Sequence, residues 1–245
     1  MRNLAFLLPG IFFFTSCKKA DLGDCFKSAG EPAVEIRELP SFNRIETYDN
    51  VDVYITLDTF NQARVEAGEH LIEKIKTEVK DGVVKIENLN SCNWVRSFKN
   101  EYSVYLTVDT FKELDCYGVG DIIGESPITT DSVKIEMLNS YSDVFLEVHA
   151  NYVHAKIHAG PGDVHLVGST DFCYTYSTGA GFIYASELVA REAWAITSGT
   201  GEIYVNAQDK LFCQIDYISN VYYKGNPTSI EQQGNGSGKL VHLGF

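Results

Sequence analysis

Between Gly118 and Leu243 the chain repeats one short phrase seven times, as in Gly118-Val-Gly-Asp-Ile122 and Gly160-Pro-Gly-Asp-Val164. The fourth residue of the phrase recurs at steps of 22, 20, 19, 20, 18 and 19 residues. In chain order these fourth residues are Asp121, Asp143, Asp163, Phe182, Glu202, Asn220 and Lys239. A period of about 20 residues is typical of a repeat architecture.

A branched apolar residue follows each of these positions, and apolar residues recur two positions later through the middle of the array. The first set is Ile122, Val144, Val164, Ile183, Ile203, Val221 and Leu240. Alternation with a period of two predicts β-strands with one inward face. About 20 residues suit one coil of a β-solenoid, since helical repeats take about thirty or more and propeller blades about forty. We therefore predict an all-β, single-chain β-helix whose coils stack about 4.8 Å apart, with glycines turning the corners at positive φ.

The first 16 residues indicate an export signal. Leu4 to Phe14 is mostly apolar but spans only about 16 Å as a helix, too short to cross a bilayer. The run Phe14-Thr-Ser-Cys17 resembles a bacterial lipoprotein lipobox, which implies cleavage before Cys17 and acylation of that residue. The alternative is a plain secretory signal with Cys17 as an incidental thiol. Residues 17–38 are polar and without period, which predicts a tether.

Residues 39–245 are then the folded domain, with an irregular N-terminal part over 39–115 and regular coils over 116–245. Solenoids need atypical end units, so the irregular start is expected. Within it, Glu69 to Lys76 predicts one or two helical turns at a corner. Removing the signal takes away Arg2 and moves the formal net charge from -13 to -14. An acidic chain without a basic run disfavours nucleic acid as a partner.

Three aspartates, Asp121, Asp143 and Asp163, are expected to form one column at successive corners. Carboxylates about 5 Å apart could bind Ca²⁺ or supply an acid and a base for glycoside hydrolysis. A repeat also places the same residue at every turn without any catalytic purpose. The favoured interpretation is that each aspartate caps its own corner through side-chain to backbone hydrogen bonds.

The histidines and cysteines do not predict a metal site, and we expect neither a metal nor another cofactor. His154 and His158 share a strand face but lie about 13 Å apart, too far for one ion. Three cysteines look like small buried hydrophobes, namely Cys116, Cys173 and Cys213. Cys25 and Cys92 are the remaining pair, and whether they form a disulfide stays open.

An outward row of aromatic residues is the most informative surface feature. It lies between the inward positions of consecutive coils and consists of Phe145, His165, Tyr184, Tyr204 and Tyr222. Rings stacked at coil spacing would form a flat stripe that suits sugar rings or a protein partner. The alternative is that the rings only stabilise the sheet by stacking on one another.

The order of several motifs resembles one family. Phe42-Asn-Arg-Ile-Glu46 is followed by Val51-Asp-Val-Tyr-Ile-Thr-Leu57, then by Val65-Glu-Ala-Gly-Glu69, and then by the glycine-rich coils. This order is similar to that of the putative auto-transporter adhesin head GIN domain family, over roughly residues 40–245. The resemblance implies an envelope lipoprotein with a β-helix fold, located at the outer membrane with possible exposure at the cell surface, and it transfers no catalytic residue.

Two classes of function remain open at this stage. The first is a non-catalytic, lipid-anchored adhesin or binding scaffold, with the bilayer and a glycan or protein as partners. The alternative is a carbohydrate-active enzyme, a polysaccharide lyase or hydrolase, that uses the column of Asp121, Asp143 and Asp163. An enzyme needs unlike polar groups that converge in a groove, whereas a scaffold presents a repetitive face.

Overall fold

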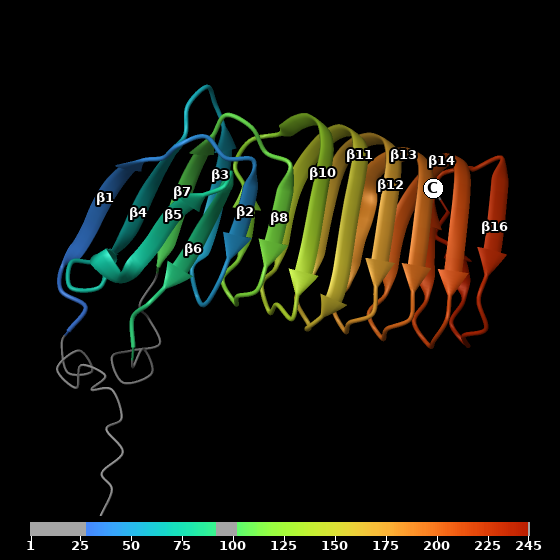
Figure 1. The fold of residues 1–245 in the computed structure, drawn as a ribbon. Helices are drawn as coiled ribbons and strands as arrows, with labels where there is room; N and C mark the ends of the chain where they lie inside the picture. Colours follow the sequence, from blue (N-terminus) through green and yellow to red (C-terminus); the bar gives the residue numbers. More distant parts are fainter. Residues whose placement is uncertain (1–27, 92–101, 245) are drawn as a thin grey trace, which may run out of the picture.

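The computed structural model describes residues 28–91 and 102–244, which wind into a β-solenoid with two sheet layers (Figure 1). In the regular coils one long strand runs through the first layer, bends, and continues through the second layer before a tight turn. These strands are β11 (Val144–Ala159), β12 (Val164–Ser177), β13 (Ile183–Thr197) and β14 (Ile203–Ile215), and β10 (Ile128–Leu138) forms the bend and the second layer of the coil before them. They pair in parallel with their neighbours. The predicted all-β solenoid with coils of about 20 residues is confirmed.

The predicted interior row is present in the first layer. Val144 pairs with Val164, which pairs with Ile183, and this residue pairs with Ile203. All four are fully buried. Towards the N-terminus the row continues through Ile122, Val53, Val104 and Val65. Each buried branched side chain contributes about 1.5–3 kcal/mol to folding, so this row is a main source of stability.

The N-terminal part is an irregular, mixed arrangement, as predicted. Its strands are β1 (Pro32–Glu38), β2 (Arg44–Thr47), β3 (Asp52–Leu57), β4 (Gln62–Gly68), β5 (Ile75–Lys80), β6 (Val83–Asn88), β7 (Ser103–Val108), β8 (Glu113–Cys116) and β9 (Ile122–Gly124). β4 pairs antiparallel with both β1 and β7, and β5 pairs antiparallel with β6. The 3-10 turn η2 (Ile72–Lys74) lies within the predicted helical segment. Among the described residues, no helix is long and apolar enough to cross a membrane.

Strand β1 lies inside the segment expected to be a tether. The fold therefore begins by Pro32, although the sequence indicated no strand before residue 39. The physical reason is pairing with β4, from Pro32 opposite Gly68 to Glu38 opposite Gln62. The predicted signal peptide and Cys17 lie outside the described residues.

Close packing between coils, rather than a positive φ, explains most of the corner glycines. A β-carbon on Gly181 would overlap the carbonyl oxygen of Gly162, and one on Gly201 would overlap that of Gly181. Neither Gly181 nor Gly201 has a positive φ, whereas Gly160 does, at 99°. The prediction that these glycines supply a left-handed conformation is therefore wrong except at Gly160. Only a residue without a side chain lets successive turns approach so closely.

The C-terminal coil is short and exposed. It contains β15 (Val221–Lys224) and β16 (Ser229–Gln233), and β17 (Leu240–His242) follows it in the next turn. β16 pairs with β14 and β17 pairs with β15. All five residues of β16 are exposed. This coil ends the stack opposite β1 (Figure 1).

Candidate binding surfaces

The aspartate column exists, but its carboxylates bond to the backbone of the next coil. The Asp143 amide donates to Oδ1 of Asp121 at 3.1 Å, and the Asp163 amide donates to Oδ1 of Asp143 at 2.9 Å. Oδ1 of Asp163 accepts from the Phe182 amide at 2.7 Å. The expectation that each aspartate caps its own corner is corrected, because the acceptor on one coil serves the amide of the following coil.

The column begins earlier than the sequence indicated. Oδ1 of Asp52 accepts from the Asp121 amide at 3.0 Å, although Asp52 lies 69 residues away. Phe182 has no side-chain acceptor, so the pattern stops there. It resumes at Asn220, whose Oδ1 accepts from the Lys239 amide at 2.9 Å. An asparagine can therefore perform the same structural task as the aspartates.

The arrangement of the column offers little for catalysis or metal binding. Asp121, Asp143 and Asp163 have equivalent partners, so no difference in environment separates an acid from a base. Within residues 28–91 and 102–244 no group of three or more His, Cys, Asp or Glu side chains is placed to hold a metal ion.

The predicted aromatic row forms a continuous ladder on the first layer. Ring centroids are 4.6 Å apart for Phe145 and His165, 4.6 Å for His165 and Tyr184, 5.2 Å for Tyr184 and Tyr204, and 4.7 Å for Tyr204 and Tyr222. The angles between successive planes lie between 8° and 23°. We call these five residues the aromatic ladder.

The same outward row continues into the N-terminal part. Tyr54 stacks on Tyr105 at 4.5 Å, and the Arg64 guanidinium lies 3.7 Å from the centroid of the Tyr105 ring. Ile123 connects this group to Phe145 through strand pairing. The sequence did not indicate this extension because Tyr54 pairs with Tyr105 and Ile123, which lie 51 and 69 residues away and outside the 20-residue period.

The geometry of the ladder limits what it can bind. Rings that stack nearly parallel cover one another's faces, so the inner members present their edges to solvent. The hydroxyl of Tyr204 donates to Oε2 of Glu202 at 2.8 Å. Burial, then this hydrogen bond and the nearby charge of Glu202, raise the pKa of Tyr204. These contacts favour the stabilising interpretation of the ladder over a platform for sugar rings.

A second set of rings lies on the other layer and was not singled out from the sequence. We call Tyr152, Phe172, Trp194 and Phe212 the aromatic patch. Centroids are 6.3 Å apart from Tyr152 to Phe172, 5.6 Å from Phe172 to Trp194, and 5.0 Å from Trp194 to Phe212. The planes are tilted by 59°, 68° and 44°. The same period could have identified the patch, since steps of 20 and 18 residues separate Tyr152 from Phe172 and Trp194 from Phe212.

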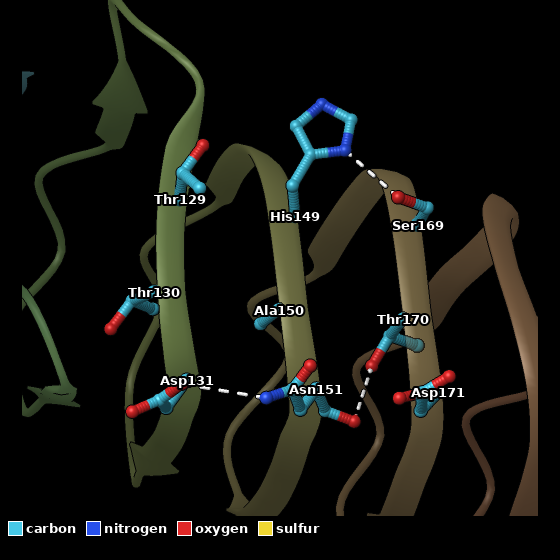
Figure 2. Close-up of a pocket in the computed structure, with 9 residues that line it drawn as sticks. All are labelled: Thr129, Thr130, Asp131, His149, Ala150, Asn151, Ser169, Thr170 and Asp171. Atoms are coloured by element: carbon cyan, nitrogen blue, oxygen red, sulfur yellow. Dashed lines mark hydrogen bonds between the residues drawn. The ribbon is translucent and has the colours of Figure 1, made fainter.

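A shallow polar hollow of about 700 Å³ adjoins the patch at the bend of the long strands. Three coils line it, through residues 129–131, 149–151 and 169–171 (Figure 2). Figure 2 shows Nδ2 of Asn151 donating to Oδ1 of Asp131 at 3.4 Å, and His149 paired with the Ser169 hydroxyl at 2.9 Å. The next residues along β11 and β12 are Tyr152 and Phe172, so the hollow and the patch are contiguous.

The remaining predicted residues occupy structural positions. Cys116, Cys173 and Cys213 are buried and unpaired, as expected for small hydrophobes, and burial raises the pKa of each thiol to about 12. His154 and His158 pack against the rings of Tyr174 and Tyr176. Cys25 and Cys92 lie outside the described residues.

Comparison with known proteins finds one family model and several solved structures that are similar to this chain. A family model described as "Putative auto-transporter adhesin, head GIN domain" matches residues 41–227. A solved structure of a putative adhesin from Bacteroides fragilis NCTC 9343 is 24% identical, with a TM-score of 0.81 and coverage of 87% of this chain and 97% of that one. No protein with a curated description matches the chain.

Two further solved structures share the fold at lower similarity. A putative adhesin from Parabacteroides merdae ATCC 43184 has 18% identity, a TM-score of 0.64, and coverage of 88% and 98%. A structure described as a putative lipid binding protein from Parabacteroides distasonis ATCC 8503 has 22% identity, a TM-score of 0.65, and coverage of 87% and 97%.

Proposed function

The chain belongs to the putative auto-transporter adhesin head GIN domain family, as the order of its motifs predicted, and we propose that it is a non-catalytic binding protein of the bacterial cell envelope. The observation that carries the proposal is a long solenoid whose stacked parallel strands present outward rows of side chains on both layers. Repeat folds use such extended surfaces for binding. Glycans and proteins are the candidate ligands, and nucleic acid is disfavoured by the net charge of -13.

We further propose that acylated Cys17 anchors the protein in the outer membrane, with the solenoid exposed at the cell surface. Fourteen residues lie between Cys17 and Pro32, where β1 begins. A chain of that length spans at most about 50 Å, so the tether sets how far the domain stands from the bilayer. Because β1 and β16 lie at opposite ends (Figure 1), the C-terminal coils would point away from the membrane.

Cell fractionation and labelling with a fatty-acid analogue test the anchor. The full chain and Cys25→Ser should both appear labelled in the membrane fraction. Cys17→Ser should be unlabelled and released from that fraction, because the acylated residue is gone. Cys25 is a matched control, since it is a nearby cysteine outside the lipobox. Retention of Cys17→Ser in the membrane would contradict lipid anchoring through this residue.

Cell adherence tests the binding role. Cells that produce the full chain should adhere to immobilised mucin more strongly than an otherwise identical strain that lacks it. A strain that produces Cys17→Ser should lose this advantage, because the protein no longer stays on the cell. Equal adherence of all three strains would count against the adhesin proposal.

The enzyme alternative has less support from the geometry. A lyase or hydrolase needs unlike groups around one bond, with an acid and a base held in different environments. Asp121, Asp143 and Asp163 instead repeat one contact, each accepting a backbone amide from the next coil. No second function is therefore proposed for this column.

A further inference from the structure

We propose that the aromatic patch and the adjoining polar hollow form one binding site for an uncharged polysaccharide. This inference rests on the proposed function as a binding protein and names the ligand class and the surface. It moves the glycan site from the aromatic ladder on the first layer to the second layer and its bend.

The orientation of the rings is the first observation. In the ladder, successive planes differ by at most 23°, so neighbouring rings occupy each other's faces. In the patch, the planes cross at 44° to 68°, which leaves parts of the faces uncovered. Tyr152 is 54% exposed and Trp194 is 42% exposed. An exposed aromatic face is the surface on which the apolar side of a sugar ring packs.

The chemistry of the hollow is the second observation. Its lining offers the hydroxyls of Thr129 and Ser169, the amide of Asn151, and the carboxylates of Asp131 and Asp171. These groups donate to and accept from sugar hydroxyls. Among the residues that the structure describes, no lysine or arginine lines the hollow. The Arg191 side chain beside it already pairs with Asp171 at 3.7 Å and with Glu192 at 2.8 Å.

Charge selects between neutral and acidic glycans. Two carboxylates line the hollow, and the cationic groups near the patch are paired: Lys210 lies 3.3 Å from Glu192. An acidic polysaccharide would bring like charge to this surface and be repelled. A neutral glycan meets no such barrier, so the site is assigned to uncharged sugars.

The length of the site fits a chain of sugars. The patch runs across four coils, from β11 to β14. At a coil spacing of about 4.8 Å, the rings cover about 14 Å along the solenoid, and the hollow widens this surface across the bend. A protein partner fits less well, because only Tyr152 and Trp194 in the patch are more than a third exposed and charged pairs surround them.

A glycan array that carries neutral and uronate- or sialate-bearing glycans tests the site. The full chain, purified in detergent, should bind neutral glycans in preference to acidic ones. Trp194→Ala and Tyr152→Ala should each weaken binding roughly three- to tenfold, by loss of one ring contact. Asn151→Ala should weaken it as well. The matched control is Tyr204→Ala, which removes a ladder ring on the other layer and should leave binding within about twofold.

Trp194→Tyr is a control for misfolding of Trp194→Ala. It keeps an aromatic face at this position and should retain most of the binding. The thermal unfolding of every variant is measured alongside. The proposal is overturned if the array shows no neutral glycan bound, if only acidic glycans bind, or if Tyr204→Ala weakens binding as much as Trp194→Ala. Capture of a protein ligand that Trp194→Ala abolishes, with no glycan bound, would also overturn it. A blank array together with normal cell adherence would remove this site and leave the proposed function standing.

Discussion

At the scale of single residues, the chain uses the same side-chain position to connect one coil to the next. The aspartate after Gly-x-Gly accepts a backbone amide that the tight turn leaves without a strand partner. The adjacent backbone completes the link, since the Val144 amide donates to the Asp163 carbonyl at 2.9 Å. A polar acceptor at this position therefore has a structural role between coils, although Phe182 shows that one coil does without it.

Replacing Asp143 separates the structural role from the catalytic one. Asp143→Ala removes the acceptor for the Asp163 amide and should lower the free energy of unfolding by about 1–3 kcal/mol. Asp143→Asn should cost less than about 1 kcal/mol, because an amide oxygen still accepts, as Asn220 does for Lys239. Denaturant unfolding measures both. If Asp143→Asn lowered the free energy of unfolding as much as Asp143→Ala does, this account would be contradicted, because a neutral acceptor would then be insufficient.

His154 should make stability depend on pH in the range where histidines titrate. Burial, assisted by the positive charges of Lys156 and Lys134, lowers the pKa of His154 below its usual 6.5. Above that pH the ring is neutral in both states, and as the pH falls the unfolded chain takes up the proton first. The free energy of unfolding should therefore fall as the pH is lowered below about 6.5.

The variant His154→Gln isolates this effect, because glutamine does not titrate. Its free energy of unfolding should fall less than that of the natural chain over the same interval. Between about pH 7 and about pH 8 the two proteins should show parallel curves, since the histidine is then neutral in both states. An identical acid dependence in the two proteins would rule out His154 as the source.

At the scale of elements, differences in coil length are accommodated by register shifts at the bend of the long strands. β13 and β14 change register between Tyr184 and Val189 and again between Ala190 and Glu192. The pairing of Tyr184 with Tyr204 is kept on one side of the bend, and that of Trp194 with Phe212 on the other. Rings in the ladder therefore face direct partners, whereas Phe172 contacts Trp194 diagonally, because its direct partner is Glu192.

Some of the turns that join the coils leave no room for a side chain at the second glycine of the phrase, as at Gly181 and Gly201, whereas Ser142 and Ser219 occupy the equivalent position in two other turns. Gly181→Ala should lower stability by about 1–3 kcal/mol, because the new methyl group would overlap the Gly162 carbonyl and push the coils apart. Gly124→Ala is the control, since its β-carbon would lie 3.1 Å from the end of the Leu146 side chain and 3.5 Å from the Phe145 carbonyl oxygen, without overlapping the backbone. Thermal unfolding compares the two. Equal melting temperatures would show that the turns can separate without cost.

At the scale of the whole molecule, the two ends of the solenoid are finished differently. At the first end, the Arg37 guanidinium on β1 donates to the Ile75 carbonyl at 2.6 Å and to the Ile72 carbonyl at 3.2 Å. These bonds join the two layers across the end of the stack. At the other end, β16 is fully exposed and its inward-register residue Ile230 is 45% exposed. The stack is thus closed at its N-terminal end and open at its C-terminal end.

Hydrogen exchange should report this difference along the chain. Amides in β12 and β13, which have a paired strand on each side, should exchange most slowly. Amides in β16 should exchange fastest among the regular strands, because the last coil opens without disturbing the others. Mass spectrometry after exchange in the full chain measures both. Protection of β16 equal to that of β12 would mean that the distal end is covered in solution.

The sequence by itself determined the solenoid, the length of its coils, the buried row from Val144 to Ile203 and the stacked aromatic ladder, because each of these follows from a local pattern repeated at a fixed period. Only the tertiary structure decided the partner of each aspartate, the role of the corner glycines, the place of β1 in the sheet and the tilt of the rings in the aromatic patch. These features depend on how one coil is shifted and rotated against the next, and for β1 on pairing with a strand about thirty residues away. The sequence of one strand alone does not specify that offset.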